Sequence, residues 1–156
     1  MYKRQLLDHE LGTLKNHLSK FTTEIDCTYK LNEETSFLNE IQRICSEAEQ
    51  AVRSGSQHLI ITDNNINKDR IALPMILATS AVHSYLIKNN LRTFTSLNVS
   101  SKECLDVHYF AVLIGVGATT VNASLVEKLI ANRYRKNIYQ NTDYPCLLYT
   151  SPSPRD

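Results

Sequence analysis

Apolar residues in the first third of the chain recur at helical spacing, then at strand spacing, then at helical spacing again. Leucines at positions 7, 11, 14 and 18 follow one helix face, so residues 6–19 are predicted to be helical. Residues 21–29 are rich in β-branched and aromatic side chains and predict a strand. A strong helix is expected to open at Asn32, with Glu33 and Glu34 in its first turn, and to stop at Gly55. Its apolar stripe consists of Phe37, Ile41, Ile44, Ala48 and Ala51.

The rest of the pattern is organised around residues 71–122, the most apolar stretch of the chain. Just before it, the short apolar run at residues 58–61 predicts a buried strand. Pro74 suits the first turn of a helix, where its missing N–H costs nothing. That helix is apolar nearly all round, so it is expected to be largely buried, and it is expected to end at Asn89 and Asn90.

A second strand and helix are predicted within the same stretch. Residues 93–99 are β-branched and aromatic and predict a strand. Ser100 and Glu103 have the spacing of a capping box, and the helix that they open is expected to break at Gly115 or Gly117. A last helix is predicted from near residue 122, with four apolar side chains on one face: Leu125, Val126, Leu129 and Ile130.

These elements form a helix, three strand–helix units and a final helix. Strands that alternate with helices predict an α/β fold with a partial parallel sheet and right-handed crossovers. Three strands make a small open sheet, as expected of a fragment of a larger α/β domain. Because such a sheet leaves its edges unprotected, we expect a chain of residues 6–145 to be marginally stable or prone to aggregate.

The two ends of the chain are predicted to be translated sequencing adapter. The peptide CLLYT at residues 146–150 can be encoded by C TGT CTC TTA TAC AC, and the reverse complement of that string is GTG TAT AAG AGA CAG. With GTG as a start codon, this complement encodes residues 1–5, MYKRQ. Residues 1–5 and 146–156 are therefore expected to be adapter, and residues 6–145 an internal fragment of a protein.

Charge and cysteine content exclude several classes of protein. Without the predicted adapter segments, the formal net charge of +1 becomes −1, which removes an electrostatic case for nucleic acid or membrane binding. No apolar run approaches the roughly 20 residues of a membrane span. Cys27, Cys45 and Cys104 are widely spaced, which argues against a metal site or a disulfide framework and suits a reducing compartment.

A phosphate site is the first chemical possibility that the sequence raises. Gly115 and Gly117 would have to follow a strand and precede a third glycine to form a dinucleotide loop, but a helical segment precedes them and Thr120 stands at the third position. A glycine-rich helix end is favoured instead. Asp63 closes a predicted strand, where α/β proteins often bind ligands, although a loop-forming or capping role is favoured.

The remaining candidate residues are assigned structural roles. His83 and His108 have no partner at metal spacing and are interpreted as hydrogen-bonded core or interface histidines. Cys45 and Cys104 are interpreted as small core residues. Arg92 could bind an anion, but a surface arginine at a strand start is the default. No residue is assigned as catalytic, cofactor-binding or metal-ligating, because no nucleophile, base and oxyanion hole come together.

Two longer segments resemble the large (alpha) subunit of glutamate synthase. Residues 72–74 (ALP), 81–87 (AVHSYLI) and 91–93 (LRT) resemble its run IPSLLA…AVHHHLI…GLRT. Residues 106–118 (DVHYFAVLIGVGA) and 121–122 (VN) resemble its run EVHHFALLIGYGA…VNPYLA. The sequence LIITD at residues 59–63 also matches the family's LSDR-type strand end.

The resemblance implies a role rather than a site. In this family the run belongs to the central domain, which links a glutamine amidotransferase domain to an FMN barrel in the same chain. The whole enzyme, an oxidoreductase of ammonia assimilation that uses FMN and an iron–sulfur cluster, makes glutamate from glutamine and 2-oxoglutarate. The fragment is expected to carry no catalytic residue and no cofactor, and to belong to an oligomeric parent in the cytoplasm, or in a plastid if the source is eukaryotic.

Several residues depart from the family pattern at polar or aromatic positions: Ser84, Tyr85, Tyr109, Val116, Ala123 and Ser124. They replace two histidines of HHH, one histidine of HH, the tyrosine of GYG, and the proline and tyrosine of NPY. These departures motivate an alternative function, in which the chain is a stand-alone α/β module that binds a small molecule and is not an enzyme.

Overall fold

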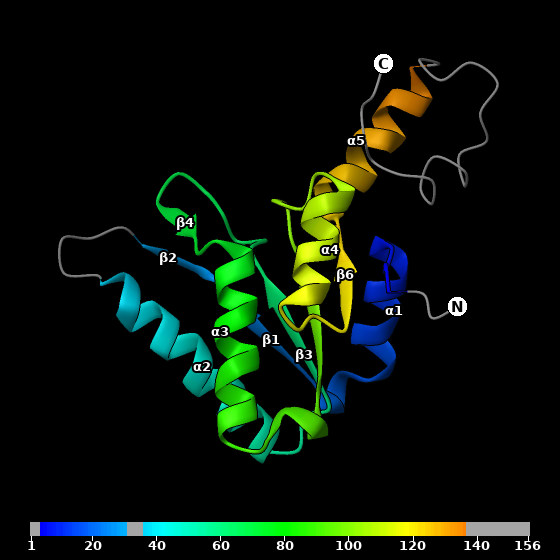
Figure 1. Cartoon of the computed structure of the whole chain (residues 1–156). Helices are drawn as coiled ribbons and strands as arrows, with labels where there is room; N and C mark the ends of the chain where they lie inside the picture. Colours follow the sequence, from blue (N-terminus) through cyan, green and yellow to red (C-terminus); the bar gives the residue numbers. More distant parts are fainter. Residues whose placement is uncertain (1–3, 31–35, 137–156) are drawn as a thin grey trace.

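The chain folds around a four-stranded parallel sheet, as a computed structural model that describes residues 4–30 and 36–136 shows (Figure 1). The strand order is β1-β3-β5-β6, and β2 pairs with β4 in a separate antiparallel ribbon. The strands are β1 (Thr22–Asp26), β2 (Thr28–Lys30), β3 (His58–Thr62), β4 (Arg70–Ala72), β5 (Ser96–Ser100) and β6 (Thr120–Asn122). The helices are α1 (Asp8–His17), α2 (Phe37–Arg53), α3 (Met75–Lys88), α4 (Val107–Gly115) and α5 (Ser124–Arg135), with 3₁₀ turns at Ser19–Phe21 and Arg92–Phe94.

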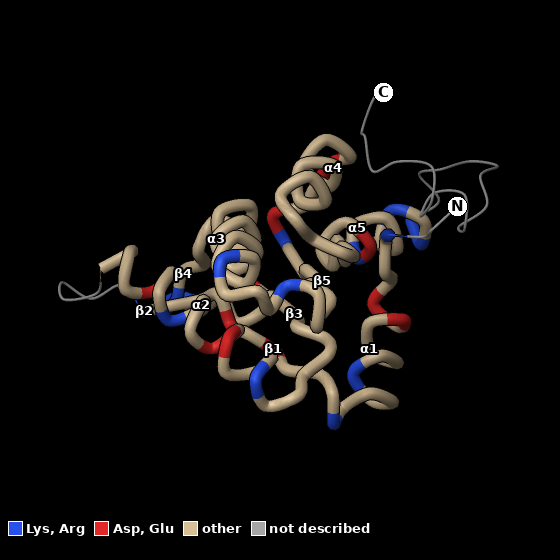
Figure 2. Tube along the Cα trace, turned by 60° about the horizontal axis from the view of Figure 1, so that its bottom comes forward, with Lys and Arg blue, Asp and Glu red and all other residues tan. Residues whose placement is uncertain are grey.

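Helices cover both faces of the sheet. Each step from one parallel strand to its neighbour passes through a helix, so α2, α3 and α4 lie side by side on one face (Figure 1). Helix α1 crosses the opposite face (Figure 2): Asp8 accepts a hydrogen bond from Asn122 on β6 at 2.9 Å, and Lys15 pairs with Glu24 on β1 at 2.7 Å. The predicted α/β architecture with a parallel sheet is therefore confirmed.

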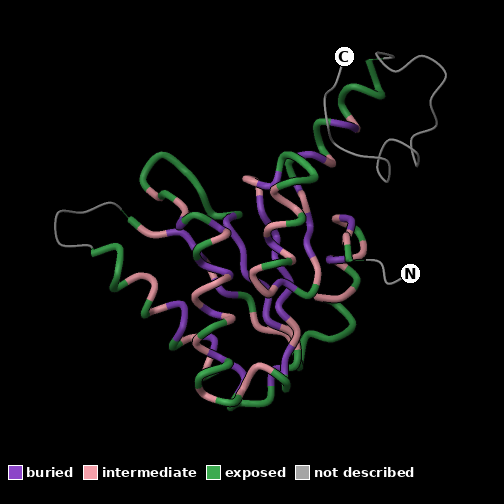
Figure 3. Tube along the Cα trace, in the orientation of Figure 1, coloured by how far each residue is buried: buried purple, intermediate pink, exposed green. Residues whose placement is uncertain are grey.

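The two faces of the sheet differ in polarity. Side chains facing α2, α3 and α4 form the main core. Figure 3 shows the buried residues along the strands and along parts of the helices that lie on them. From the strands this core takes Ile25, Leu59, Ile61, Leu97, Val99 and Val121. The alternate positions point to the face that α1 crosses, and the register aligns Glu24, Ile60, Asn98 and Thr120 there in one row. This face is mostly polar, and its side chains bond to one another, as in the 2.7 Å bond from Thr120 to Asn98.

Three positive-φ residues end helices where the sequence predicts breaks. Gly55 follows α2 at φ 99°, Asn90 follows α3 at φ 58°, and Gly117 follows α4 at φ 116°. At each of them two backbone N–H groups turn back to the last helical turn; after α2, for example, Gly55 donates to Val52 and Ser56 donates to Ala51. The predicted ends of all three helices are confirmed.

Two predicted strands are shorter than expected. The strand predicted over residues 21–29 divides after Asp26, because its carboxylate accepts hydrogen bonds from the N–H and hydroxyl of Thr28 and turns the chain into β2. The strand predicted over residues 93–99 begins only at Ser96, since Arg92–Phe94 form a 3₁₀ turn. The fourth parallel strand, β6, was not predicted, because three residues are too few to show a period.

The starts of three helices also differ from expectation. The capping box of Ser100 and Glu103 is wrong: Ser100 ends β5, and α4 is capped instead by Asp106, which accepts from the N–H of Tyr109 at 2.6 Å. Pro74 is the residue before α3 and not part of its first turn. Helix α2 begins at Phe37, and the predicted cap at Asn32 lies outside the described residues.

Helix burial is narrower than the apolar pattern predicts. Helix α3 buries five residues but leaves Leu77 42% and Ile87 52% exposed, so it is not largely buried. Only Val126 and Ile130 of the four apolar residues on α5 are buried, against Leu7. Within the described residues, no helix combines the length and the apolarity that crossing a membrane requires.

Residues 4–6 run beside β6 at one edge of the sheet. The N–H of Leu6 donates to Val121, and Val121 donates to Arg4. These are backbone bonds, which any residue except proline can make, so they do not test whether Arg4 and Gln5 derive from adapter. The adapter assignment stays a prediction, and residues 1–3 and 146–156 lie outside the described residues.

A chain cut to residues 6–145 is expected to aggregate more readily than the full chain. The cut removes the backbone of Arg4 and Gln5 from the β6 edge and leaves that strand's hydrogen-bonding groups free to pair with another molecule. Light scattering during a thermal ramp, at several protein concentrations, measures the effect. A sharp, concentration-independent melt of monomeric material would contradict it.

Candidate functional site

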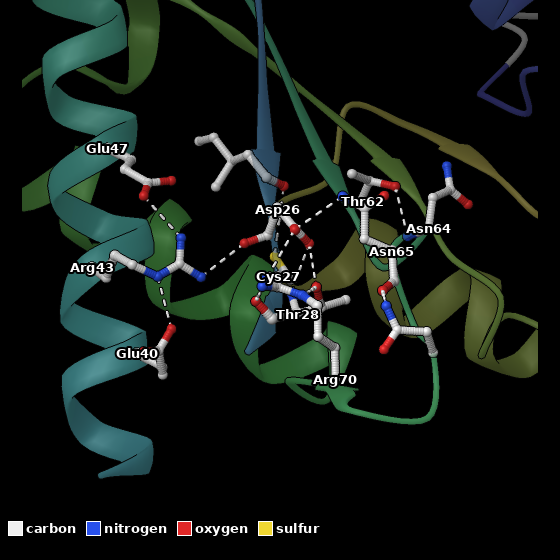
Figure 4. Close-up of polar contacts among 12 residues, drawn as sticks. Asp26, Cys27, Thr28, Glu40, Arg43, Glu47, Thr62, Asn64, Asn65 and Arg70 are labelled. Carbon is white, nitrogen blue, oxygen red and sulfur yellow. Dashed lines mark hydrogen bonds and ion pairs between the residues drawn. The ribbon is translucent and has the colours of Figure 1, made fainter. Parts of the chain in front are cut away.

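The carboxyl ends of the parallel strands are where α/β proteins usually bind ligands, so the polar residues gathered there form the candidate site. Asp26 ends β1, Asp63 follows β3, and Ser101 follows β5. Figure 4 shows Asp26 among polar groups from α2, β2, the loop after β3 and β4. These groups could bind a ligand only where their hydrogen-bonding capacity is not already used within the chain.

The Asp26 carboxylate is fully engaged by its neighbours. Arg70 Nη2 lies 3.1 Å from Asp26 Oδ2, and Asn65 donates to the same oxygen at 3.0 Å. Thr28 donates to Asp26 Oδ1 from both its N–H and its hydroxyl. Burial alone would raise the pKa of Asp26, but the bonds from Asn65 and Thr28 and the charge of Arg70 outweigh it and lower that pKa.

An open, polar pocket lies beside this cluster. Its lining consists of Asp26, Asn65, Ile66, Asn67 and Arg70. Arg70 already donates to Asp26, to the Thr28 hydroxyl at 2.9 Å and to the Thr28 carbonyl at 2.6 Å. A phosphate such as that of FMN would meet the carboxylate of Asp26 and an arginine that is already bonded, so these residues do not fit the flavin.

Asp63 is a buried carboxylate that joins two loops. Its side chain is 0% exposed and accepts from the N–H of Lys102 at 2.8 and 3.1 Å and from the Ser101 hydroxyl at 3.5 Å. Burial raises the pKa of Asp63, although the N–H and the charge of Lys102 act in the opposite direction. The predicted loop-forming role of Asp63 is confirmed, because its oxygens bind the chain just after β5.

Glu103 caps a helix other than the one predicted from its sequence position. Its Oε2 accepts from the N–H of Met75, at the start of α3, at 3.0 Å and from the Tyr109 hydroxyl at 2.5 Å. Burial, followed by the bond to Glu103, raises the pKa of Tyr109. Tyr109, one of the departures from the family pattern, therefore fixes α4 to the start of α3.

Tyr85, another departure, donates to Glu49 on α2 at 2.8 Å.

His83, Arg92 and Gly117 form the third polar cluster, at the opposite ends of the strands. Arg92 Nε donates to His83 Nδ1 at 2.9 Å, and Arg92 Nη2 donates to the Gly117 carbonyl at 2.9 Å. Arg92 Nη1 donates to the Thr95 carbonyl at 2.7 Å. The predicted hydrogen-bonded role of His83 is confirmed. Arg92 binds main-chain carbonyls, so it is neither a free anion site nor a plain surface arginine.

The stability contributed by the His83–Arg92 bond is expected to depend on pH. Burial, with the charge of Arg92, lowers the pKa of His83 below its usual value near 6.5. The unfolded chain therefore binds more protons at this site than the folded chain between the two pKa values. Stability is fully present above about pH 6.5 and falls as pH decreases toward the lower folded pKa. Urea midpoints measured between pH 8 and pH 5 would show this fall.

A His83→Asn variant provides the control for that pH series. Its side-chain oxygen can accept from Arg92 but does not titrate, while every other histidine is unchanged. The difference between the two pH profiles gives the contribution of His83 to the pH dependence of stability. Parallel profiles for the parent chain and the variant would show that His83 does not contribute.

The other candidates have structural positions. Cys45 and Cys104 are 5% and 2% exposed and are core residues, as predicted. His108 is exposed on α4, so it is not a core histidine, and its predicted interface position stays a prediction. Gly115 and Gly117 end α4, which confirms the helix-end interpretation.

The described residues do not fit a metal centre. No group of three or more His, Cys, Asp or Glu side chains comes together among them. An iron–sulfur cluster is held by thiolates, but burial raises the pKa of Cys27 and of Cys104 to about 12, so both remain thiols. These two thiols therefore do not fit the role of cluster ligands.

Comparison with known proteins agrees with the residue patterns. Residues 3–149 match the family model of the glutamate synthase central domain. The chain is 49% identical over 131 residues to the NADPH glutamate synthase large chain of Azospirillum brasilense, which covers 83% of this chain and 9% of that relative. It is 43% identical over 83 residues to the chloroplastic ferredoxin-dependent glutamate synthase of Spinacia oleracea, covering 52% of this chain and 5% of the relative.

A bacterial relative of another genus matches over a similar span. The large chain of the NADPH glutamate synthase of Bacillus subtilis is 42% identical over 80 residues, which covers 51% of this chain and 5% of the relative. The chain thus spans less than a tenth of the length of the curated relatives it matches. On the family match and the identity to the Azospirillum relative, the chain belongs to the glutamate synthase central domain family.

Proposed function

We propose that this chain is part of the central domain of a glutamate synthase large chain, where it links a glutamine amidotransferase domain to an FMN barrel. In this role it holds the two active sites apart and supports the passage of ammonia between them in glutamate synthesis from glutamine and 2-oxoglutarate. The observation that carries the proposal is the 49% identity over 131 residues to the Azospirillum brasilense large chain.

The polar groups of the candidate site support a scaffolding role. Asp26, Asp63 and Glu103 each accept at least two hydrogen bonds from the chain itself. Arg70 and Arg92 each donate to main-chain carbonyls. Side chains engaged in this way position loops and helices and are not free to bind a substrate or move a proton. The same observation weighs against the alternative of a stand-alone small-molecule-binding module.

Sequence of the DNA that flanks the coding region is the first test. The proposal expects an open reading frame that continues into an FMN-barrel sequence on one side and an amidotransferase sequence on the other. A stop codon shortly after Pro145 in the natural gene would contradict it.

A chimeric enzyme provides the functional test. Residues 6–136 of this chain replace the aligned segment of the Azospirillum brasilense large chain, and glutamate formation is measured with glutamine and with added ammonia. The proposal expects the chimera to use glutamine at a rate comparable to that of the unmodified enzyme. A folded, flavin-loaded chimera that uses ammonia but not glutamine would refute the proposed link between the two sites.

A further inference from the structure

The two edges of the parallel sheet differ in what lies beside them. Strand β1 forms one edge. Phe21 and Cys27 bond to the β3 side of β1, so the backbone N–H and C=O of Glu24 point outward, and Glu24 is exposed. Strand β6 forms the other edge, where the outward N–H and C=O of Val121 both bond to residues 4–6. The β1 edge is therefore in contact with water, whereas the β6 edge has a partner.

The residues that follow this partner segment are anchored to β6 and α5. The carbonyl of Leu6 accepts from Asn122 Nδ2 at 3.0 Å, and Asp8 Oδ1 accepts from the same amide at 2.9 Å. The N–H of Asp8 donates to Glu127 Oε2 at 2.8 Å, and Leu7 is buried against α5. All these residues lie outside the predicted adapter segments. They fix where the chain meets the β6 edge and in which direction it runs, whatever precedes Leu6.

The pairing with β6 uses only the main chain. The N–H of Val121 donates to the carbonyl of Arg4 at 2.8 Å, and its carbonyl accepts from the N–H of Leu6 at 2.9 Å, which is the pattern of a parallel pair centred on Gln5. Any residue can supply a carbonyl, so other residues in place of Arg4 and Gln5 can form the same pair. With this segment in place Val121 is 0% exposed, and a buried N–H without an acceptor is destabilising.

We propose that, in the whole glutamate synthase large chain, the residues directly before Leu6 form a strand that pairs in parallel with β6, an inference that rests on the proposed function. We call the segment that ends at Leu6 the entry strand. It extends the sheet to five parallel strands, and because it is parallel to β6 it begins at the end of the sheet where the other strands begin. Backbone hydrogen bonds, and not a flexible linker, then hold the upstream part of the large chain to this domain.

Disulfide formation in the full-length large chain tests the pairing. One cysteine replaces the second residue before Leu6, which the register places beside Thr120. Its partner is Thr120→Cys, and the matched control partner is Glu24→Cys, which lies in the same row of the sheet at the opposite edge. Neighbouring strands lie about 4.8 Å apart, which a disulfide can span, whereas β1 is four strands away from the entry strand.

The disulfide is quantified by mass spectrometry of unreduced peptides during mild oxidation. It is expected to form with Thr120→Cys at least about tenfold faster than with Glu24→Cys, because pairing holds the two thiols at a high effective concentration. Equal rates for the two partners would overturn the proposal. Disulfides that join two copies of the chain and disappear on dilution would assign the β6 edge to a second molecule, which also overturns it.

Hydrogen exchange in the unsubstituted large chain gives a second measurement, which needs no cysteine pair to fold. The N–H of Val121 points to the entry strand, and the outward N–H of Glu24 is the matched control. After correction for intrinsic rates, the amide of Val121 is expected to exchange at least about tenfold more slowly than that of Glu24, because exchange then requires local opening. Equal exchange at the two amides would contradict the pairing.

These results are separable from the proposed function. If the flanking sequence encodes no amidotransferase or FMN-barrel domain, the proposed function itself fails. If it encodes both domains and the disulfide forms no faster with Thr120→Cys than with Glu24→Cys, only the entry strand falls.

Discussion

Gly117→Ala is expected to lower the free energy of unfolding by roughly 3–5 kcal/mol, the sum of a backbone cost and a packing cost. Gly117 has φ 116°, a conformation that residues with a Cβ rarely adopt. A Cβ at this position would also overlap the His83 ring, with Cγ as the nearest atom. The ring is held by Arg92, which also binds the Gly117 carbonyl, so neither partner can move without breaking a bond. Equilibrium urea unfolding, followed by far-UV circular dichroism, measures the loss.

Two further variants separate the causes. Gly12→Ala is the matched control, because nothing lies within 4 Å of a Cβ there and the residue is inside α1. It is expected to stabilise the chain by about 0.5–1 kcal/mol. In a Gly117→Ala, His83→Ala pair the ring is absent, so only the backbone cost should remain. A neutral effect of Gly117→Ala alone would contradict the close contact with His83.

Arg92→Met is expected to lower the free energy of unfolding by about 2–3 kcal/mol, since it leaves acceptors without a charged donor. Arg92 binds the carbonyls of Thr95 and Gly117 and the ring of His83. These contacts fix the start of β5 to the end of α4. Arg92→Lys should recover only a small part of the loss, because an ammonium cannot reproduce the planar fork of the guanidinium.

Arg53→Met is the control for Arg92→Met. Arg53 pairs with Glu49 one helical turn away, its side chain is 59% exposed, and exposed pairs of this kind contribute little. The change in unfolding free energy is expected to stay within about 0.5 kcal/mol. Equal losses of unfolding free energy in Arg53→Met and Arg92→Met would show that the hydrogen bonds of Arg92 do not stabilise the fold more than an exposed ion pair does.

Residue patterns predicted the repeating units of the fold more reliably than their boundaries. The parallel sheet and the ends of α2, α3 and α4 follow from short-range signals: apolar runs, and Gly or Asn at a helix end. The sequence pattern does not show that the strand ends at Asp26. It ends there because the Asp26 carboxylate accepts hydrogen bonds from the N–H and the hydroxyl of Thr28, and these bonds form only in the folded turn. Strand β6 was missed because only pairing with β5 shows that three residues form a strand.

The polar clusters were predicted less well, because most of their contacts join residues distant in sequence. Glu103 has the spacing of a local cap, yet its carboxylate binds Met75, which only the packing of α4 against α3 brings near. Sequence alone predicts a surface or anion-binding role for Arg92, because no residue near it in the sequence indicates that the Gly117 carbonyl lies within hydrogen-bonding distance. Asp63 was correctly expected to order a loop, since a carboxylate after a buried strand commonly binds nearby N–H groups.

By itself, the sequence determined the family and the α/β class, because each depends on local composition and on strings of consecutive residues. The tertiary structure decided which charged side chains are engaged with one another, and which apolar helix face remains uncovered in this chain. Hydrogen bonds and burial are properties of distances between residues far apart in sequence. The apolar outer side of α4 shows this limit: its composition is evident in the sequence, but only the packed structure shows that this chain leaves it exposed.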